Sequence, residues 1–462
     1  MSQRSHRANG GSDPKEESMS DSTPAPHIAG PARPESEPGL EGAEHPAAAP
    51  APSSGPAPAG PTRRTIVLVL VAAAGMYIMV LTLSTALSLR LASIDPDAKE
   101  TSYSLTVSVS SIALLVAVPL AGALSDRTTS RFGRRRPWIL GCLVAALLGT
   151  AVIGAVSSIP VIVVAYVVAI IAAQAAFNAY STIPVEALPD VKRGRVMGVM
   201  GMFGAFAMSG GSYLAAAFVD VPLVMMVAPI LLALALALPL LFFYKDPVRD
   251  RSELPPLDLK GIARTFVVNP RKHPDFGWAW LSRFLAGIAM SAMFSYFVFF
   301  LMDGLHMPIG EAGQQAGTLS LISAPVSVLF FTASGWVSDK IGRRKPFVVV
   351  AALLMAAGLV IGGTASTFAQ FIAAWIVFSM GQAMYLTVDM ALCAAVLPDA
   401  RDTGKDVAVI ALALSIPNII VPAAAPTILA TGDGHNYQLL WFGAAAICAL
   451  GSFTVTFIKS VR

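Results

Sequence analysis

The sequence predicts an all-α membrane protein with twelve transmembrane helices arranged as two pseudo-symmetric six-helix bundles. Three observations lead to this prediction. Charged residues make up only 13% of the 462 residues and hydrophobic residues 55%, whereas a soluble globular chain has about 25% charged residues. Long apolar runs follow one another from residue 65 onward, and two sequence landmarks recur at the same offset in the second half. So little charge does not cover a water-facing surface of this size, which excludes an ordinary soluble enzyme.

The first 62 residues differ in composition from the rest of the chain. They hold 12 of the 33 prolines and 8 of the 28 acidic residues, and the stretch from Ala47 to Pro61 is nearly all Pro, Ala, Ser and Gly. Such a segment buries too little apolar surface to offset its chain entropy, so we predict a disordered tail for residues 1–62. It lacks the apolar core and the early cluster of positive charge of a secretory signal peptide.

The apolar runs after the tail have the length of membrane helices. Roughly 20 apolar residues cross a hydrocarbon core about 30 Å thick, and long continuous runs favour helices over the short strands of a barrel. The predicted helices are 65–91, 103–125, 137–157, 160–187, 195–218, 222–244, 277–301, 313–337, 346–365, 367–397, 407–430 and 436–458. The long charged connection 245–276 divides them into bundles at 63–244 and 277–462.

Basic residues predict the orientation of these helices. Of the 32 Lys and Arg residues, 29 fall in the tail, at the C-terminus or in alternate connections that share one side. Arg90 and Lys99 fall on the other side, and Arg283 lies within a span. Because the side rich in Lys and Arg stays in the cytoplasm, we expect a multi-pass protein of the cell membrane (plasma or inner) with both termini cytoplasmic. This asymmetry, and not a nucleic-acid partner, accounts for the net charge of +4.

The two halves of the chain share a repeated loop. Residues 122–138 read GALSDRTTSRFGRRRPW and residues 335–347 read GWVSDKIGRRKPF, with their Gly-Arg-Arg segments 209 residues apart. The Leu-Pro-Asp sequences at 188–190 and 397–399 have the same offset. Two unrelated landmarks with one offset indicate duplication of a six-helix unit, which is the architecture of one large class of secondary transporters.

The repeated pattern Gly-x-x-x-Asp-Arg/Lys-x-Gly-Arg-Arg/Lys resembles the signature loop of the major facilitator superfamily. Its first copy, SDRTTSRFGRRRPW, is more similar to the sucrose and glycoside–cation symporter branch. The sequence departs from the melibiose type because the second span has no acidic residue at its middle, so a sodium site of that type is not expected. The fifth span also lacks the Gly-Pro-x-x-Gly-Gly run of drug–proton antiporters. The resemblance implies a transporter that works by alternating access.

Charged residues of the two loops are the candidates for gating. The Asp126 carboxylate lies where it can meet the N-terminus of a neighbouring helix and the arginines of its own loop, and Asp339 has the equivalent place in the second half. Such pairs favour one conformer over the other. The expected gating residues are Asp126, Arg127, Arg131, Gly133, Arg134, Arg135, Glu186, Asp339, Gly342, Arg343 and Arg344. The alternative is that the basic residues only anchor the topology.

Two ionisable residues lie deeper in the predicted spans, where such groups are costly and usually functional. Asp389 is eight residues from the end of its apolar run and Arg283 is six residues into its own, which places them roughly 12 Å and 9 Å from the same side. Burial favours the neutral carboxyl group, whereas a nearby guanidinium favours the ionised one. We therefore hypothesise that Asp389 carries a coupled proton and that Arg283 modulates it. A static ion pair is the alternative.

The resemblance implies that spans 1, 4, 7 and 10 line a central cavity. Polar residues on spans 1, 4 and 10 recur at helical spacing and share one face of each helix. The expected cavity residues are Tyr77, Ser84, Gln174, Asn178, Ser181, Gln382 and Tyr385. Hydrogen bonds between helices would explain part of this set equally well.

No residue pattern indicates a cofactor, a metal or a catalytic centre. Cys142, Cys393 and Cys448 lie singly in apolar stretches, and His435 lies in an external loop without a second carboxylate nearby in the sequence. No phosphate-binding GxxxxGK[ST] loop is present, so transport driven by ATP hydrolysis in this chain is not expected.

The leading interpretation is proton-coupled symport of a sugar or glycoside by a monomer in the lipid bilayer. Its partners would be a small-molecule substrate and protons rather than sodium. One alternative is proton-coupled efflux of an amphipathic small molecule, because Met290, Met293 and Phe294 make the seventh span apolar. A receptor without transport activity, built on the same fold, is a second alternative.

Overall fold

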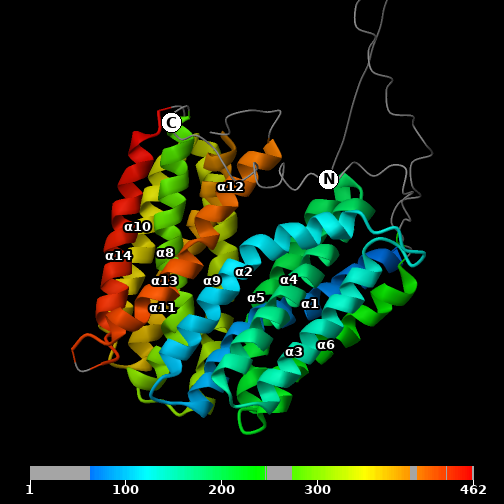
Figure 1. The fold of residues 1–462 in the computed structure, drawn as a ribbon. Coiled ribbons are helices and arrows are strands. Elements are labelled where there is room, and N and C mark those ends of the chain that lie inside the picture. The colour runs from blue at the N-terminus through cyan, green and yellow to red at the C-terminus, as the bar shows by residue number, and fades with distance from the viewer. Residues whose placement is uncertain (1–62, 245, 247–272, 396–402, 433, 460–462) are drawn as a thin grey trace, which may run out of the picture. The chain divides into compact units, whose positions relative to one another are not determined.

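The computed structural model describes residues 63–244, 246, 273–395, 403–432 and 434–459, and these residues form helices without any strand (Figure 1). The helices of the first half are α1 (Arg63–Ile94), α2 (Lys99–Asp126), α3 (Arg136–Ala155), α4 (Ile159–Ala187), α5 (Asp190–Ala217) and α6 (Pro222–Phe243). Those of the second half are α8 (Pro274–Asp303), α9 (Ile309–Ile341), α10 (Lys345–Gly363), α11 (Phe368–Ala395), α12 (Thr403–Ser415), α13 (Pro417–Leu429) and α14 (Tyr437–Thr454), which the 3₁₀ turn Val455–Phe457 follows.

Within the described residues, twelve segments are long and apolar enough to cross a membrane, which agrees with the predicted number. The predicted span 407–430 corresponds to the candidate span Ala408–Leu429, within which the helix is interrupted at Ile416, between α12 and α13. Pro417 has no backbone N–H to donate and fits the first turn of a new helix. The predicted tail 1–62 and nearly all of the predicted connection 245–276 lie outside the described residues.

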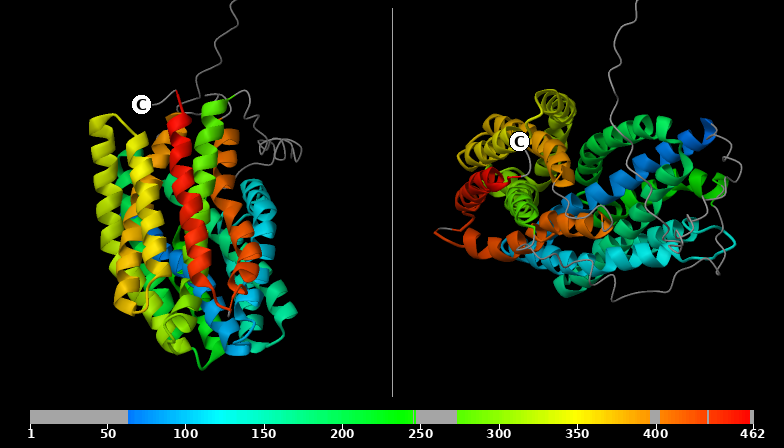
Figure 2. Two further views of the ribbon diagram at one scale, coloured as in Figure 1. Left: turned by 90° about the vertical axis from the view of Figure 1, so that its left-hand side faces the viewer. Right: turned by 90° about the horizontal axis from the view of Figure 1, so that it is seen from above.

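Each half packs its helices mainly within itself. In the first half α1 packs on α5 and α6, and α3 packs on α4 and α6. In the second half α10 packs on α11 and α14, and α8 packs on α14. The two groups stand side by side in Figure 1 and in the view from above (Figure 2, right), and they meet through the pairs α5–α9 and α2–α13.

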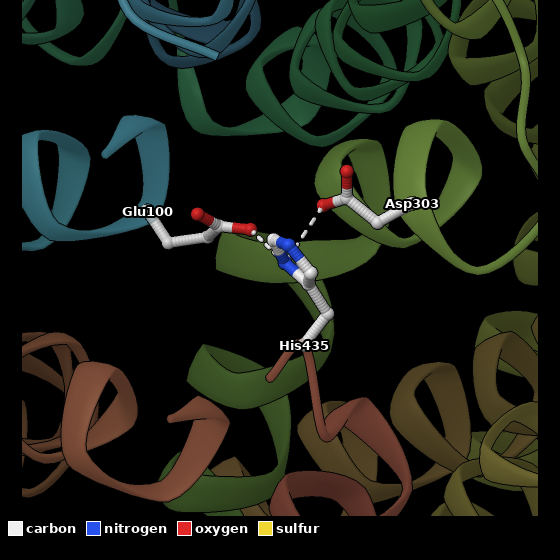
Figure 3. A group of neighbouring side chains, drawn as sticks. All are labelled: Glu100, Asp303 and His435. Carbon is white, nitrogen blue, oxygen red and sulfur yellow. Dashed lines mark hydrogen bonds and ion pairs between the residues drawn. The ribbon is translucent and has the colours of Figure 1, made fainter. Parts of the chain in front are cut away.

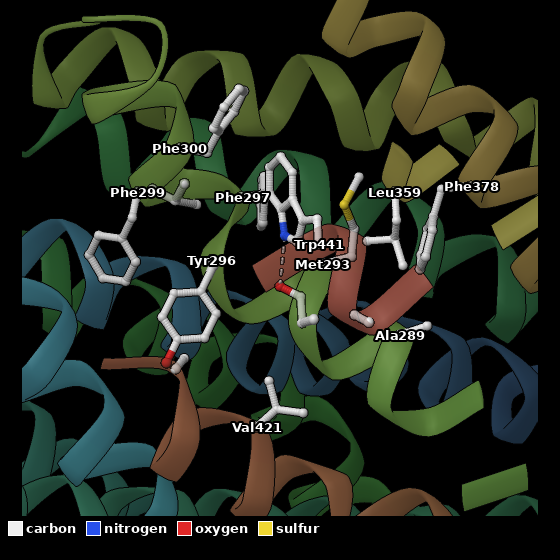
Figure 4. Close-up of a cluster of buried hydrophobic side chains, with 14 of the residues drawn as sticks. Ala289, Met293, Tyr296, Phe297, Phe299, Phe300, Leu359, Phe378, Val421 and Trp441 are labelled. Atoms are coloured by element: carbon white, nitrogen blue, oxygen red, sulfur yellow. Dashed lines mark hydrogen bonds between the residues drawn. The ribbon is translucent and has the colours of Figure 1, made fainter. Parts of the chain in front are cut away.

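The cores of the two halves differ in side-chain size. The first half has small residues at its helix contacts, and a Cβ atom on Gly75 would lie only 2.9 Å from the Cα atom of Ala233 on α6. The second half is filled by large aromatic side chains (Figure 4). There Trp441 is fully buried and its Nε1 donates to the carbonyl oxygen of Ala292 at 3.4 Å. Small residues allow the close helix approach that is typical of membrane bundles, whereas the aromatic rings fill a wider space.

The bundle has two ends, which we name by the chain segments that lie there. The termini side holds the start of α1 and the end of the 3₁₀ turn, and the distal side holds the start of α2 and the end of α8. Hydrogen bonds between the halves gather toward the distal side. Ser104 and Tyr296 share one of 2.6 Å between their hydroxyl groups, and Ser209 donates to the carbonyl of Gly317 at 2.8 Å. The halves are therefore closed against each other on the distal side.

Candidate functional site

An ion pair between α8 and α11 lies inside the second half. Nη1 of Arg283 donates to Oδ2 of Asp389. Asp389 is fully buried and Arg283 is 6% exposed, so both charges are held away from solvent. The sequence predicts similar depths for the two residues, and the structure brings them into contact. The role of this pair in coupling stays a prediction.

Three further polar side chains, those of Cys393, Tyr385 and Ser282, lie around this ion pair. Cys393, one turn after Asp389, places its Sγ 3.7 Å from Oδ1 and 3.9 Å from Nη1 of Arg283. Tyr385 lies one turn before Asp389 on α11, and its hydroxyl lies 3.4 Å from Oγ of Ser282. Residues four apart share one face of α11, so a single helix face carries all three of these groups to the arginine.

A cavity of about 500 Å³ lies between the halves and is bounded by α1, α5, α8, α9 and α11. Its polar lining residues are Ser84, Thr85, Ser320, Ser323, Ser327, Ser379 and Gln382. Its aromatic lining residues are Phe294, Phe297, Phe331 and Trp375. Among the described residues that line this cavity, none carries a charge. An uncharged wall of hydroxyl groups, one amide and aromatic rings suits a neutral polar molecule with apolar faces.

The cavity contains Ser84 and Gln382, which the sequence predicts, and also serines of α9, which it does not. Ser320, Ser323 and Ser327 stand at positions i, i+3 and i+7 of that helix and therefore on one face. This spacing is readable in the sequence. The prediction omits it because the family resemblance points to spans 1, 4, 7 and 10 alone as the cavity lining.

The other predicted cavity residues lie elsewhere. Gln174 lines a second cavity of about 700 Å³, which Asp126 also lines and which α2, α4, α12 and α13 surround. Asn178 and Ser181 line a smaller cavity of about 200 Å³ next to it. Tyr77 packs edge-to-face on an aromatic ring of α4, with ring centroids 5.2 Å apart. The 700 Å³ cavity reaches the last residue of α2, so it separates the halves toward the termini side.

The first loop forms the ion-pair network that its sequence suggested. Asp126 pairs with Arg135 at 2.6 Å, and Nη1 of Arg135 donates to Oγ of Ser125 at 3.0 Å. Oε1 of Glu186 accepts from Arg134 at 2.5 Å and from Arg135 at 3.2 Å. The ends of α2 and α4 are therefore tied to the start of α3. Whether these contacts gate transport stays a prediction.

Asp246, a carboxylate that the sequence patterns do not single out, caps α3. Its Oδ2 accepts the backbone N–H of Arg135 at 2.5 Å and that of Arg136 at 3.1 Å. A carboxylate at a helix N-terminus satisfies free donors and matches the helix dipole. The sequence predicts that the Asp126 carboxylate meets the N-terminus of a neighbouring helix. At α3 the carboxylate in that position is instead Asp246, which follows α6 in the chain. Gly133, with φ +97°, lies against the Asp246 carboxyl group, where no side chain would fit.

Arg131 and Arg127 complete the candidate residues of the first loop. The guanidinium of Arg131 stacks 4.8 Å from the ring centroid of its neighbour Phe132, and both side chains are exposed. Arg127 is half-buried at the end of α2.

The second loop is looser than the first. Asp339 reaches Arg344 only at 4.0 Å and its side chain is 74% exposed. Nη1 of Arg344 donates instead to the carbonyl oxygen of Ala391 at 2.7 Å. Arg343 is exposed, and Gly342 ends α9 with φ +67°. The two loops are therefore similar in sequence, but the ion pair of the first loop is closer than that of the second.

A third group of ionisable residues joins the halves on the distal side (Figure 3). Lys99 and Glu100 begin α2, Asp303 ends α8, Tyr437 begins α14, and His435 lies two residues before it. Figure 3 draws Glu100, Asp303 and His435. Nζ of Lys99 lies 2.8 Å from Oδ1 of Asp303, and Nδ1 of His435 lies 2.9 Å from Oε1 of Glu100. We call these five residues the distal cluster. The expectation that His435 lies without a second carboxylate near it holds along the sequence and is wrong in space, since the carboxylates of Glu100 and Asp303 lie beside its ring.

The chain matches a known family along most of its length and single curated relatives over a short stretch. Residues 65–333 and 312–461 match the family model described as Major Facilitator Superfamily. A stretch of 51 residues, 11% of this chain, is 53% identical to proton-associated sugar transporter A of Homo sapiens. A stretch of 52 residues is 48% identical to solute carrier family 45 member 4 of Mus musculus. Each stretch covers 7% of the length of these curated relatives.

Solved structures with the same fold cover most of the chain. The nucleoside transporter NupG has a TM-score of 0.68 at 12% identity, over 85% of this chain and 99% of that one. A D-xylose-proton symporter has a TM-score of 0.59 at 19% identity, over 86% and 97%. A bacterial homolog of the human lysosomal transporter Spinster, in an inward-facing conformation, has a TM-score of 0.59 at 15% identity, over 86% and 96%. Likeness at such low identity concerns the fold alone.

Proposed function

Because the chain belongs to the major facilitator superfamily and is therefore a multi-pass membrane transporter rather than an enzyme, we propose that it carries out proton-coupled symport of a neutral sugar or glycoside. The two halves rock about the central cavity, so that the cavity opens to one side of the membrane at a time. The 29 basic residues on one side support a cytoplasmic termini side, with the tail 1–62 and the connection 245–276 on that side and the halves at 63–244 and 277–462. A monomer in the cell membrane suffices for this cycle.

The uncharged cavity of about 500 Å³ carries this proposal. A sugar presents hydroxyl groups around its rim and C–H groups on its faces. Hydroxyl and amide side chains such as those of Ser379 and Gln382 bind the rim, and an aromatic ring such as that of Trp375 packs against a face. Trp375, Ser379 and Gln382 are at positions i, i+4 and i+7 of α11. They therefore share one face of that helix.

The buried pair supplies the coupling in this proposal. Asp389 lies seven residues beyond Gln382 on α11, which is about 10 Å along the helix, and Tyr385 lies between them. In this proposal a shift of α11 against α8 within the second half accompanies the rocking and changes the contact between Asp389 and Arg283, so the carboxyl group binds a proton more readily when the guanidinium withdraws. By linkage, proton binding and substrate binding then alter each other equally. Arginine suits this role because its charge is permanent.

The names of two similar proteins support the same substrate class. The relative that shares a 51-residue stretch is named a proton-associated sugar transporter, and one structural neighbour is a D-xylose-proton symporter.

The test of coupling is transport by purified protein in liposomes under an imposed pH gradient, with a panel of labelled neutral monosaccharides, disaccharides and glycosides. We expect the wild type to accumulate one of them. A folded Asp389→Asn variant should exchange labelled for unlabelled sugar but fail to accumulate it. Asp220→Asn, which removes an exposed carboxylate between α5 and α6, is the matched control and should accumulate sugar normally. Accumulation at the wild-type level by Asp389→Asn would end the coupling proposal.

The test of the substrate site uses the same assay. Gln382→Ala should raise the half-saturating sugar concentration about 3- to 10-fold, the effect of losing one hydrogen bond. Gln370→Ala, at the exposed start of the same helix, should leave it unchanged. An unaltered half-saturating concentration in Gln382→Ala would remove this cavity from the proposal.

Efflux of an amphipathic molecule is the second candidate, because Phe294, Phe297 and Phe331 make one wall of the cavity apolar. Drug tolerance and sugar uptake measured in one expressing strain separate the two candidates. Increased tolerance without sugar uptake would favour efflux.

A further inference from the structure

The distal cluster is the place where ionisable groups of the two halves meet (Figure 3). Oε1 of Glu100, from the first half, lies 2.9 Å from Nδ1 of His435 and 2.9 Å from the hydroxyl of Tyr437. Oδ2 of Asp303 lies 3.5 Å from the same imidazole nitrogen and 2.6 Å from the same hydroxyl. Lys99 and Glu100 lie 3.7 Å apart. Their other contacts within the cluster are with residues of the second half.

The charges of this cluster leave room for one more positive charge. Within the described part of the chain, two carboxylates face one ammonium group, that of Lys99, and Glu100 and Lys99 are both 6% exposed. Lys99 lies within ion-pair distance of both carboxylates, so it balances one of their two negative charges. The side chain of His435 is 48% exposed, so protons reach it from solution. Histidine is the side chain that changes charge between about pH 5 and 8.

The backbone holds the imidazole ring in this position. His435 has φ +56°, which is uncommon for a residue other than glycine, and it follows Gly434 with φ +88°. The next residue, Asn436, fixes the start of α14 by accepting the N–H of Leu439 at 2.9 Å. A strained residue next to a helix cap is kept in place by its surroundings, and such residues cluster at ligand sites and switches.

We propose that His435, Glu100 and Asp303 form a proton-binding site on the distal side, separate from Asp389, and that a proton bound there holds this side of the transporter closed. An imidazolium ring at this position adds the missing positive charge between carboxylates of opposite halves. Opening the distal side separates Glu100 from His435 and Asp303, so the attraction between the charged ring and Glu100 is lost. Acidification therefore favours the closed distal side, and alkaline conditions favour its opening.

The position of this site along α8 separates it from the coupling pair. Asp303 is the last residue of α8 and lies 20 residues beyond Arg283, which is about 30 Å along the helix. The proposal needs alternating access but no particular substrate, so its test does not depend on the sugar being identified.

The experiment measures how far apart the halves stand on the distal side. Spin labels are attached to Ser157→Cys, in the α3–α4 connection, and Thr367→Cys, in the α10–α11 connection, both exposed residues of the distal side. Two native cysteines are buried and the third is half-buried, so brief labelling modifies the engineered pair. Distances are recorded in nanodiscs at pH 5.5 and pH 8.0 with EDTA present. We expect the ratio of open to closed distal states to rise about 10-fold at pH 8.0, since one charge-assisted hydrogen bond shifts an equilibrium by about that factor.

Variants decide between this site and any other source of pH dependence. His435→Gln and Glu100→Gln should each lose the pH response, and His435→Lys should stay closed at both pH values. His306→Gln is the matched control, because His306 is an exposed histidine on the same side that also has φ +56°, and it should respond as the wild type does. A pH response that persists in His435→Gln, vanishes in His306→Gln, or is absent from the wild type in EDTA would overturn the proposal.

Discussion

Arg283 and Asp389 respond differently to the loss of their partner, because only one of them is able to become neutral. The carboxyl group of Asp389 loses its charge when it binds a proton, whereas the guanidinium of Arg283 stays charged at any working pH. Both lie among membrane helices, where a lone charge is costly. Loss of Asp389 should therefore cost more free energy than loss of Arg283, although each residue is the ion-pair partner of the other.

This asymmetry predicts unequal destabilisation. Asp389→Asn leaves a permanent buried charge and should lower the free energy of unfolding by about 3–5 kcal/mol, whereas Arg283→Met should cost less. The defect of Arg283→Met should shrink further as the pH falls, because protonation removes the stranded carboxylate charge. Thermal unfolding of purified variants between pH 5 and 8 measures both effects. Equal losses at every pH would contradict the argument, and the double variant should recover most of the stability.

Gly133 and Gly342 occupy equivalent positions of the repeated loop, and both adopt positive φ angles. A Cβ atom on Gly133 would collide with the carboxyl group of Asp246, whereas one on Gly342 has no heavy atom within 4 Å. Glycine is therefore required at position 133 by both the positive φ angle and the lack of space, and at position 342 by the positive φ angle alone.

We predict that Gly342→Ala costs about 1 kcal/mol of stability, from backbone strain alone. Gly133→Ala should cost about 1–3 kcal/mol more, since it also displaces the carboxylate that caps α3. The midpoint of thermal unfolding of each variant gives the comparison. Asp246→Ala is the control: combined with Gly133→Ala it should show much less than the sum of the two single effects, and full additivity would count against this contact.

At the scale of helices, α1 and α5 approach each other closely at one point. A Cβ atom on Gly211 would overlap the side chain of Thr82, and Gly211 is buried between the two helices. The adjacent Gly210 is exposed, and a Cβ atom added there would have no heavy atom within 4 Å. The chain thus offers two neighbouring glycines with opposite surroundings.

Gly211→Ala should therefore destabilise the first half by about 1–3 kcal/mol, the usual cost of overpacking. Gly210→Ala should be neutral or slightly stabilising, because alanine favours the helix. Detergent-solubilised protein, heated in steps and analysed by size-exclusion chromatography, measures the loss of folded material. If Gly210→Ala is the more damaging change, the assignment of the helix contact is incorrect.

At the scale of the whole molecule, contacts between the halves are gathered on the distal side, and the 700 Å³ cavity separates the halves toward the termini side. One helix, α8, carries Arg283 toward one end and Asp303 at the other. A displacement of α8 relative to α2 and α11 therefore changes both the contact of Arg283 with Asp389 and the contact of Asp303 with Lys99. In the proposed cycle this helix connects the rocking of the halves with proton binding at both sites.

The orientation of the whole molecule gives a topology prediction. With 29 of 32 basic residues on the termini side, a reporter fused at Ser2 should be active only if it works in the cytoplasm. The same reporter inserted at Asp97, in the α1–α2 connection, should show the opposite activity. A Ser2 fusion that is active only outside the cell would reverse the assignment of both sides.

The fold class, the number of spans and the repeat can all be predicted from the sequence alone, because lipid demands long apolar helices whose length is visible in any apolar run. The depths of Arg283 and Asp389 are predictable in the same way, since depth follows from the rise per residue of a helix. The structure places Arg283 against Asp389 and places Ser84 and Gln382 in the central cavity, and the roles of these residues stay predictions.

Which remote residues meet becomes visible only in the folded chain. Glu100 and His435 are 335 residues apart, and Asp246 reaches α3 from beyond α6, so no local spacing indicates either contact. The division of the predicted cavity residues among separate cavities has the same origin. Periodicity tells which face of a helix is polar, but the rotation of each helix against its neighbours decides what that face meets, and this rotation follows from the packing of all the helices together.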